Sequence, residues 1–283
     1  MKSVVITGVS TGIGWSSAKF LLQKGYRVFG SVRKQEDAER LTREFGGNFI
    51  PLIFDVTDEA AVQAAAQTVR EQLQGETLFG LVNNAGIAIA APLIHMPTDE
   101  FRHQIEVNLV SVLIVTKAFA PLLGADRSLR GEPGRIINMS SVGGKRGSPF
   151  LGPYVTSKHG LEGFSETLRR ELILYGIDVI IIGPGPIATP IWDKAEQANA
   201  STQYQDTDYY EAGLKVERYM VKQGKKGLPP ETVAEIVWTA LTSPNPRVRY
   251  AIEPGNPIRN FIQSLLPKRT LDSIIAKNLG FKK

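Results

Sequence analysis

Short apolar runs that are rich in β-forming residues alternate with helical patterns along most of this chain. Six such runs lie at 4–6, 27–30, 49–54, 78–82, 135–139 and 178–182, and we expect a seventh near 248–252. Strands that are apolar along almost their whole length are typical of a parallel sheet buried under helices on both faces. Crossovers between such strands are right-handed. The pattern therefore predicts an α/β fold, built on a doubly wound parallel sheet of about seven strands.

Chains of this length, 283 residues, commonly form one α/β domain, so we expect a single domain over 1–283. The segment at about 187–228 has no clear strand pattern and carries Trp192 and several tyrosines among polar residues. Long excursions of this kind often cover a ligand pocket. We interpret this one as a substrate lid, although its tyrosines could equally pack it onto the body. A variable C-terminal segment follows at about 253–283.

Composition argues against several classes of site. Cysteine is absent and the three histidines are scattered, so we expect no disulfide and no metal site. The formal net charge is +5, but the basic residues are spread without interleaved aromatics, which favours a solvated surface over a nucleic-acid site. The first strand begins close to Met1, and no stretch of 18 or more uncharged apolar residues occurs. We therefore expect a cytoplasmic protein.

The C-terminal segment has a basic amphipathic pattern. Apolar residues at 261–266 precede Lys268-Arg269, and Leu271, Ile274 and Ile275 recur before the last lysines. Such a segment can lie on a membrane. More often an apolar stripe of this kind covers the protein's own core or a subunit interface. We therefore do not expect membrane association, although this segment leaves it open.

Three glycines, Gly8, Gly12 and Gly14, directly follow the first predicted strand and open a helix. Small residues allow the backbone to approach a pyrophosphate, and the free N–H groups at a helix start bind phosphate charge. The loop therefore predicts a nucleotide site, with a tight turn that binds nothing as the alternative. Its spacing, Gly-x-x-x-Gly-x-Gly, differs from the Gly-x-Gly-x-x-Gly of two-domain dehydrogenases.

Residues Thr7 to Gly14 resemble the Thr-Gly-x-x-x-Gly-Ile-Gly fingerprint of the short-chain dehydrogenase/reductase family. The resemblance covers about 2–189, and residues 164–177 are similar to the branch that includes retinol, 17β-hydroxysteroid and 3-hydroxybutyrate dehydrogenases. Those relatives differ in substrate and in cofactor. The resemblance implies a Rossmann-type fold, a nicotinamide cofactor, and a homodimer or homotetramer formed through helices that begin near Phe101 and Tyr154.

The resemblance also implies which residues bind the cofactor. Asp55 would contact the adenine ring, the turn at 84–86 would support the glycine loop, and the segment at 184–189 would pass the nicotinamide. The full predicted set is Gly8, Ser10, Thr11, Gly12, Ile13, Gly14, Arg33, Asp55, Val56, Asn84, Ala85, Gly86, Tyr154, Lys158, Pro184, Gly185, Ile187 and Thr189.

The end of the second strand bears on the choice of cofactor. An acidic residue there would bind the adenosine ribose of NAD, whereas a basic residue would pair with the 2′-phosphate of NADP. By the resemblance Val32 stands where an NAD enzyme has its acid, and the planar fork of Arg33 suits a phosphate. This favours NADP(H). NAD(H) remains possible because Glu36 and Asp37 lie close by, and Arg33 could also be an exposed charge beside Lys34.

Tyr154 and Lys158 lie one helical turn apart if a helix begins near Pro153, so both project from one face. An unperturbed tyrosine has a pKa near 10. Lowering it by about three units requires about 4 kcal/mol, which the Lys158 ammonium and an oxidised nicotinamide could jointly supply. Tyr154 would then donate the proton in reduction and accept it in oxidation. By the resemblance Lys158 also holds the nicotinamide ribose.

Two further catalytic residues are implied by the resemblance. Ser141, thirteen residues before Tyr154, matches the serine that hydrogen-bonds the substrate oxygen, with Ser140 as the alternative. Asn108 matches the asparagine that supports a water-mediated proton relay to Lys158. A buried amide that is satisfied by the core is the other interpretation of Asn108.

These residues predict an NADP(H)-dependent oxidoreductase that transfers a hydride between nicotinamide and a carbonyl or alcohol carbon. The aromatic lid favours a bulky apolar substrate, of the steroid, retinoid or aromatic-ketone kind, over a small hydroxy acid, which would need a cation in the pocket. The alternatives are an NAD-dependent dehydrogenase of a smaller hydroxy acid or alcohol, and a nucleotide-sensing protein without turnover. A hydrolase is disfavoured because no Gly-x-Ser-x-Gly elbow occurs and Ser141 has no recognisable histidine partner.

Overall fold

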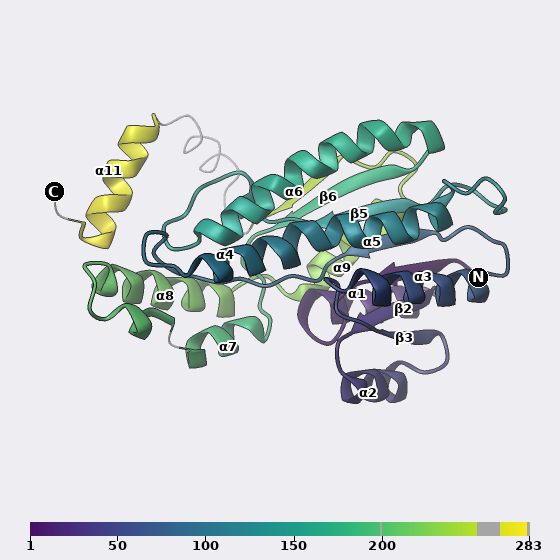
Figure 1. Ribbon diagram of the computed structural model, residues 1–283, viewed down its shortest axis with the longest axis horizontal. Helices are drawn as coiled ribbons and strands as arrows, with labels where there is room; N and C mark the ends of the chain where they lie inside the picture. Colours follow the sequence, from purple (N-terminus) through teal and green to yellow (C-terminus); the bar gives the residue numbers. More distant parts are fainter. Residues whose placement is uncertain (199, 254–266, 282–283) are drawn as a thin grey trace.

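The computed structural model describes residues 1–198, 200–253 and 267–281. One parallel sheet of seven strands, in the order β3-β2-β1-β4-β5-β6-β7, forms its centre. Helices cover both faces of this sheet (Figure 1). The strands are β1 Ser3–Ile6, β2 Arg27–Val32, β3 Phe49–Ile53, β4 Gly80–Asn83, β5 Arg135–Met139, β6 Asp178–Pro184 and β7 Arg249–Ile252. The predicted doubly wound sheet is confirmed, including its seventh strand.

The helices alternate with the strands as the sequence pattern predicts. Those that pack on the sheet are α1 Gly12–Gln23, α2 Gln35–Phe45, α3 Glu59–Leu73, α5 Ser111–Phe119, α6 Gly152–Glu171 and α9 Pro230–Thr242. Helix α4 Thr98–Ile105 packs on α6. The π-helical turn η1 Glu106–Val110 joins α4 to α5, and the short 3-10 turns are η2 Ala120–Leu123, η3 Val142–Gly144, η4 Leu172–Tyr175 and η5 Ala200–Tyr204. The remaining helices are α7 Ile191–Ala198, α8 Tyr210–Lys225 and α11 Lys268–Leu279.

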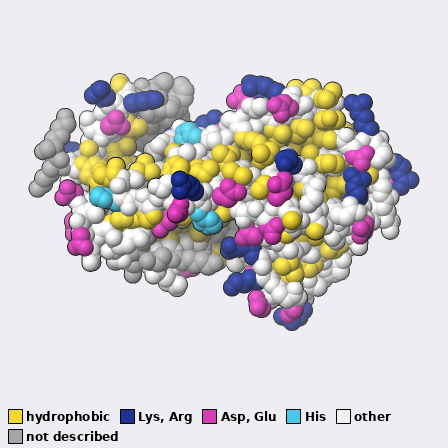
Figure 2. Space-filling view, in the orientation of Figure 1, with side chains coloured by type: hydrophobic (Ala, Val, Ile, Leu, Met, Phe, Trp, Pro, Cys, Tyr) yellow, Lys and Arg dark blue, Asp and Glu magenta, His cyan; other side chains and the backbone are white. Residues whose placement is uncertain are grey.

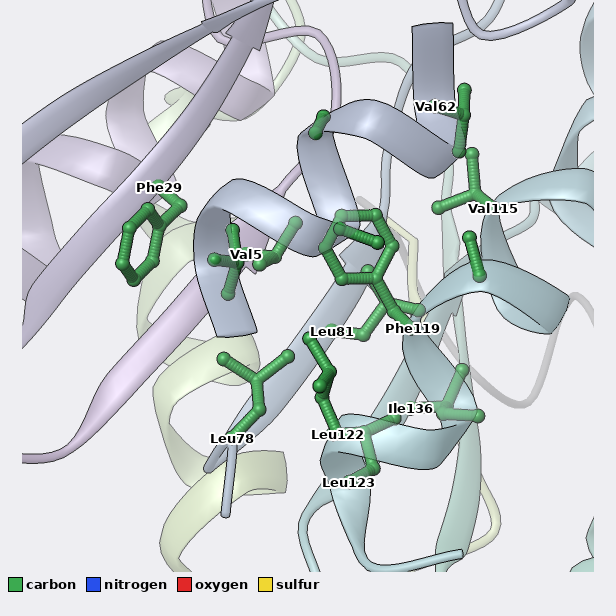
Figure 3. Close-up of a cluster of buried hydrophobic side chains, with 14 of the residues drawn as sticks. Val5, Phe29, Val62, Leu78, Leu81, Val115, Phe119, Leu122, Leu123 and Ile136 are labelled. Atoms are coloured by element: carbon green, nitrogen blue, oxygen red, sulfur yellow. The ribbon is translucent and has the colours of Figure 1, made fainter. Parts of the chain in front are cut away.

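Two hydrophobic layers hold the helices on the sheet. The first packs side chains of α3 and α5 against one face, and Figure 3 shows Phe119 of α5 among Val5, Leu81 and Ile136 from the strands. The second packs α1, α2 and α9 against the other face. Burying a large apolar side chain contributes about 1.5–3 kcal/mol. Because these strands carry apolar side chains on both faces, they gain this contribution in full only when helices cover both faces.

The strand order reverses between β1 and β4, which are neighbours in the sheet although β2 and β3 separate them in the sequence. Their register pairs Ile6 with Val82, so both strands end at about the same level. In open parallel sheets, ligands bind in the crevice beyond the carboxyl ends of the strands at such a reversal. The fold therefore brings the glycine loop and the turn at 84–86 to one edge.

The run from Thr98 to Leu123 is the one described stretch that is long and apolar enough to cross a membrane. More than half of its most apolar window, 56%, is buried inside the protein. It packs against α3 and α6, as the core helix of a layered fold does. Within this run the π-helical turn η1 carries Asn108.

The predicted lid segment at 187–228 contains α7, η5 and α8. Helix α11 packs on α8, and Lys215 Nζ donates a hydrogen bond to the Leu279 carbonyl at 3.3 Å. Leu271, Ile274 and Ile275 lie on α11, which has no fully buried residue. Residues 261–266 of the predicted amphipathic pattern lie outside the described residues, so the alternatives for this segment remain open.

Candidate active site

The glycine loop between β1 and α1 requires its small residues for its own geometry. Gly8 has φ of 71° and Gly12 has φ of 64°, in the left-handed region that favours glycine. A Cβ added to Gly14 would lie 2.1 Å from the Gly8 carbonyl oxygen. The predicted sharp turn from strand into helix is thus present.

The start of α1 is open to an anion. Thr11 is the N-cap residue, but its side chain makes no capping hydrogen bond, and no acidic residue lies in the first turn. The first N–H groups of a helix have no partner within the helix, and together with the helix dipole they attract negative charge. The residues present therefore fit the phosphate of a dinucleotide, with Ser10 and Ile13 flanking the turn.

The turn after β4 is fastened to the glycine loop. The Thr7 hydroxyl accepts hydrogen bonds from the backbone N–H groups of Asn84 and Ala85 at 2.9 and 3.0 Å. Asn84 Nδ2 donates to the carbonyls of Thr7 and Gly8 at 2.9 and 3.0 Å. These contacts hold the glycine loop in place, which is the support that the resemblance implies for the turn at 84–86.

The residues that directly follow β2 are basic rather than acidic. Val32 is buried, and the Arg33 side chain is 74% exposed with its guanidinium 4.0 Å from the Asp55 carboxylate. Burial raises the pKa of Asp55, but hydrogen bonds from Thr57 and the charge of Arg33 outweigh it, so the pKa lies below its usual value. Val56 follows Asp55 and is buried. An exposed guanidinium, with one long ion pair to Asp55, therefore stands at the end of β2 where the sequence predicts it.

The two acidic alternatives beside Arg33 differ in their surroundings. Asp37 forms an ion pair with Arg40 at 2.9 Å on the surface of α2, whereas Glu36 is exposed. Arg40 also donates a hydrogen bond to the Ser10 carbonyl at 2.8 Å, so it reaches back to the glycine loop. Sequence reasoning missed Arg40, because only the packing of α2 brings it to this loop.

Tyr154, Lys158 and Ser141 meet at the carboxyl end of β5. Pro153 lies in the first turn of α6, which brings Tyr154 and Lys158 to one face, with Lys158 Nζ 5.8 Å from the centre of the Tyr154 ring. Lys158 Nζ donates to the Met139 carbonyl at 2.8 Å. Ser141 forms a hydrogen bond with Tyr154, and its hydroxyl accepts from the Gly143 N–H at 3.0 Å. The structure thus assembles the predicted trio.

Burial dominates the pKa values of Tyr154 and Lys158. Burial raises the pKa of Tyr154, and the hydrogen bond with Ser141 opposes that rise. Burial lowers the pKa of Lys158 to about 8. The lowering of the Tyr154 pKa that the sequence predicts requires the charge of an oxidised nicotinamide as well as that of Lys158. The protein's own side chains leave this pKa raised, because desolvation outweighs the hydrogen bond in this shielded position.

Asn108 is fully engaged inside the protein. Its Oδ1 accepts from the Ile87 N–H at 2.9 Å, and its Nδ2 donates to the Ile87 carbonyl at 2.9 Å and to Ser157 Oγ at 3.1 Å. These bonds match the interpretation of a satisfied core amide. A Cβ added to Gly86 would lie 3.1 Å from Asn108 Oδ1 and 3.9 Å from Lys158 Nζ, so Asn108 also lies beside the site of the implied relay.

The segment after β6 lies against both Ser141 and the glycine loop. The Ser141 hydroxyl donates to the Pro184 carbonyl at 3.3 Å, and the Gly185 N–H donates to the Ile252 carbonyl at 2.7 Å. A Cβ on Gly12 would lie 3.4 Å from the Thr189 side chain. Ile187 of the same segment is buried. The fold thus gathers the predicted residues of this segment against both Ser141 and the glycine loop.

The comparisons with known proteins agree with this geometry. The family model of the short chain dehydrogenases matches residues 2–200. The chain belongs to the short-chain dehydrogenase family. An NADPH-dependent 3-dehydrocapnine reductase of Ornithobacterium rhinotracheale is 40% identical over 279 residues, which cover 99% of this chain and 98% of the relative. Retinol dehydrogenase 16 of Mus musculus is 33% identical, over 97% of this chain and 87% of the relative.

A solved structure shows the same fold. The short-chain dehydrogenase/reductase of Burkholderia phymatum in complex with NAD has a TM-score of 0.77 at 24% identity, over 93% of this chain and 92% of that one. The curated relatives confirm the retinol dehydrogenase-like branch. This short-chain dehydrogenase is therefore an oxidoreductase of a family that acts on CH–OH and C=O groups.

A cluster of charges around the buried Glu162 lies behind Ser141 of this short-chain dehydrogenase. Glu162 of α6 is 6% exposed and accepts hydrogen bonds from Ser140 Oγ at 2.8 Å and from Arg249 Nε at 3.0 and 3.1 Å. Arg249 also donates to the Ser141 carbonyl at 3.4 Å, and Lys145 lies 3.2 Å from the Glu162 carboxylate. Because its hydroxyl is bound to Glu162, Ser140 is less suited than Ser141 to meet a substrate.

Sequence reasoning missed this cluster. Glu162 lies four residues after Lys158, on the same face of the helix, and a carboxylate on that buried face is the signal that could have been read. Nothing in the sequence indicates that Arg249, at the start of the last strand, is its partner. Burial raises the pKa of Glu162, but the hydrogen bonds from Arg249 and Ser140 and the charge of Arg249 lower it by more. The pKa of Glu162 therefore lies below its usual value.

A cavity of about 260 Å³ lies beside the start of α6, the helix that carries Tyr154 and Lys158. Its walls are residues 88–92 after the turn at 84–86, Phe150 and Leu151 just before α6, and the inner sides of α7, η5 and α8. Apolar and aromatic side chains dominate these walls, and none of the described lining residues is a lysine or arginine. Pockets of this composition take ligands with a largely apolar body.

Proposed function

We propose that this protein is an NADP(H)-dependent reductase or dehydrogenase of a bulky, largely apolar ketone or alcohol. The observation that carries the proposal is that Ser141, Tyr154 and Lys158 come together in a shielded position. The uncapped start of α1 and an apolar cavity beside the start of α6 provide places for a phosphate and for an apolar substrate. The bound nicotinamide would supply or accept the hydride. The chain's own residues would bind the carbonyl oxygen and move its proton.

Each residue of the trio has a distinct role in this proposal. The hydroxyls of Ser141 and Tyr154, already in hydrogen-bond contact, would both face the substrate oxygen, and Tyr154 would give its proton to that oxygen during reduction. Lys158 donates a hydrogen bond to the Met139 carbonyl. Because its pKa is about 8, it carries a positive charge near the tyrosine at lower pH. That charge favours the phenolate left on Tyr154.

The choice of NADP(H) is supported by the residues at the end of β2. Arg33 is exposed with only a distant ion pair, Val32 offers no carboxylate, and Arg40 reaches the glycine loop from α2. A guanidinium binds a phosphate through two parallel hydrogen bonds. The NADPH-dependent relative from Ornithobacterium rhinotracheale supports the same choice. The smaller hydroxy acid of the NAD-dependent alternative is disfavoured by the lack of a described cation in the cavity.

The first test follows reduced nicotinamide by absorbance. NADPH and NADH are supplied in parallel with steroid ketones, retinal, aromatic diketones and acetoacetate. We expect consumption of NADPH with a bulky carbonyl. Saturable binding of cofactor without turnover of any carbonyl would instead support the nucleotide-sensing alternative.

Arg33→Ala tests the choice of cofactor. We expect it to weaken NADPH binding about tenfold or more and to change NADH binding little, because it removes a charge-assisted pair with the 2′-phosphate, worth about 1.5–3 kcal/mol. The matched control is Lys34→Ala, which removes an adjacent exposed charge. Equal losses for both cofactors would assign the adenosine contact to Glu36 instead.

A further inference from the structure

One face of α8 forms a wall of the cavity. Gly213, Val216, Met220 and Val221 line it, and their spacing of three or four residues marks a single side of the helix. Glu217 lies in the middle of that side and lines the cavity with them. The other side chains of this face are apolar or absent, so a carboxylate here is the exception that needs a physical reason.

Glu217 has neutral partners in the part of the chain that the structure describes. Its Oε2 accepts hydrogen bonds from the Ser201 N–H at 3.1 Å and from the Ser201 hydroxyl at 2.5 Å. No described lysine or arginine lines the cavity, and no ion pair joins Glu217 to a described cation. The carboxylate is half-buried, and charge in such a place is stabilised by a counter-charge. Within the described cavity wall that counter-charge is missing.

A second polar group on the same wall is unsatisfied. Tyr204 of η5 lines the cavity and is 7% exposed, and its buried hydroxyl has no hydrogen-bond partner among the described residues. A buried hydroxyl without a partner costs about 1–3 kcal/mol. Burial, and then the Glu100 carboxylate, raise the pKa of Tyr204.

Aromatic rings form another part of the cavity wall. Phe150, Trp192 and Tyr209 line the cavity together with Tyr204. Phe150 and Tyr209 meet edge to face at 6.1 Å, and the Trp192 ring is fixed by a hydrogen bond from its Nε1 to the Ile187 carbonyl at 2.7 Å. The faces of aromatic rings attract cations, most strongly where water is excluded. Carboxylate, free hydroxyl and rings therefore all favour the same kind of ligand group.

We propose that Glu217 and Tyr204 form a subsite for an ammonium group, so that the substrate is a largely apolar ketone or alcohol that also carries an amine. An ammonium has three N–H donors and no acceptor. It can donate to the free lone pairs of the Glu217 carboxylate and to the Tyr204 hydroxyl oxygen. The subsite lies beside α7, at the end of the molecule where α4 and α6 begin (Figure 1). The ketone part of this proposal rests on the proposed function, whereas the ammonium part does not.

Calorimetry with two simple probes tests the subsite. Octylammonium chloride and 1-octanol have the same apolar chain, and each is titrated into the full chain in the presence of NADPH at pH 7. We expect octylammonium to bind at least tenfold more tightly than 1-octanol. Equal affinities, or no binding of octylammonium, would overturn the proposal.

Glu217→Gln is the decisive variant. Its amide oxygen can still accept from Ser201, so the contact between η5 and α8 is kept while the charge is lost. We expect the preference for octylammonium to disappear. The matched control is Glu196→Gln, which removes a carboxylate of the same segment that is paired with Lys225 at 2.6 Å and does not line the cavity. A preference that survives in Glu217→Gln would contradict the assignment.

Two further measurements separate the parts of the proposal. Tyr204→Phe is expected to weaken octylammonium binding several-fold, and an unchanged affinity would remove Tyr204 from the subsite. Oxidation of NADPH by 2-octanone tests the reductase alone, because this ketone carries no amine. Binding of octylammonium that depends on Glu217, without turnover of any ketone, would contradict the proposed function and leave the ammonium subsite standing.

Discussion

Tyr154 is the residue on which the proposed chemistry depends most directly. Its hydroxyl is shielded from water and is hydrogen-bonded to Ser141. We expect Tyr154→Phe to lower kcat by about 10²- to 10⁴-fold, because general acid catalysis contributes that much, and to leave the Kd for NADPH nearly unchanged. Steady-state assays and cofactor titration measure the two quantities. Tyr26→Phe, in the second hydrophobic layer, is the control, and unchanged turnover in Tyr154→Phe would refute the assignment.

The lowered pKa of Lys158 makes the free energy of unfolding depend on pH. Burial lowers its pKa from 10.5 to about 8, so between these values the unfolded chain binds more protons than the folded one, and stability rises with pH. Below pH 8 the lysine is charged in both states and the full cost of burying that charge applies. Relative to Lys158→Met, the wild-type protein should gain up to about 3 kcal/mol between pH 8 and pH 10.5. Urea unfolding of both proteins measures this difference, and parallel pH profiles would show that Lys158 has an ordinary pKa.

At the scale of elements, the ion pair between Glu162 and Arg249 joins α6 to β7 behind Ser141. Their side chains are 6% and 23% exposed. Arg249→Met leaves the Glu162 carboxylate buried with only Ser140 and the exposed Lys145 near it. We expect a loss of about 3 kcal/mol in the free energy of unfolding, the lower end of the range for breaking a buried pair. Urea denaturation measures it.

The double variant Glu162→Gln/Arg249→Met provides the control for this element. Removing both charges avoids an unpaired buried charge, so part of the lost stability should return. A double variant that is less stable than Arg249→Met would show that the pair is not what joins α6 to β7.

At the scale of the whole molecule, hydrophobic side chains gather on the surface over α5 and α6 (Figure 2). Leu113 of α5 is 45% exposed, and Ile173 and Leu174 in η4, which directly follows α6, are 69% and 68% exposed. Contiguous apolar surface of this kind usually marks an interface. The resemblance implies that these helices form the contact between copies of the chain.

We expect Leu113→Lys to shift the protein toward the monomer, because it places a charge inside the proposed interface. Sedimentation at micromolar concentration measures the assembly. Ile53→Lys, at the end of the edge strand β3 and 49% exposed, is the control. A wild-type protein that is already monomeric, or an assembly that survives in Leu113→Lys, would contradict this interface.

Local sequence patterns were sufficient for the sheet and for most of the predicted site. Apolar runs such as 135–139 form strands wherever two helical layers can cover them. Glycines such as Gly8 are required by a local backbone geometry that only they adopt readily. The spacing of Tyr154 and Lys158 sets their common face through the pitch of a helix. Features of this kind depend on neighbours in the sequence.

Contacts between distant segments could not be predicted in the same way. Arg249 meets Glu162 across 87 positions, and Arg40 meets Ser10 only after α2 has packed. The π-helical turn at Asn108 and the placement of Glu217 inside an apolar cavity also depend on the surrounding elements. The sequence by itself determined the order of the elements, the glycine loop and the catalytic pair, because short-range sterics and periodicity dictate them. Only the tertiary structure decided which charges are buried, how the pKa of Tyr154 shifts, and which polar groups face the cavity, because these depend on desolvation by residues far away in the chain.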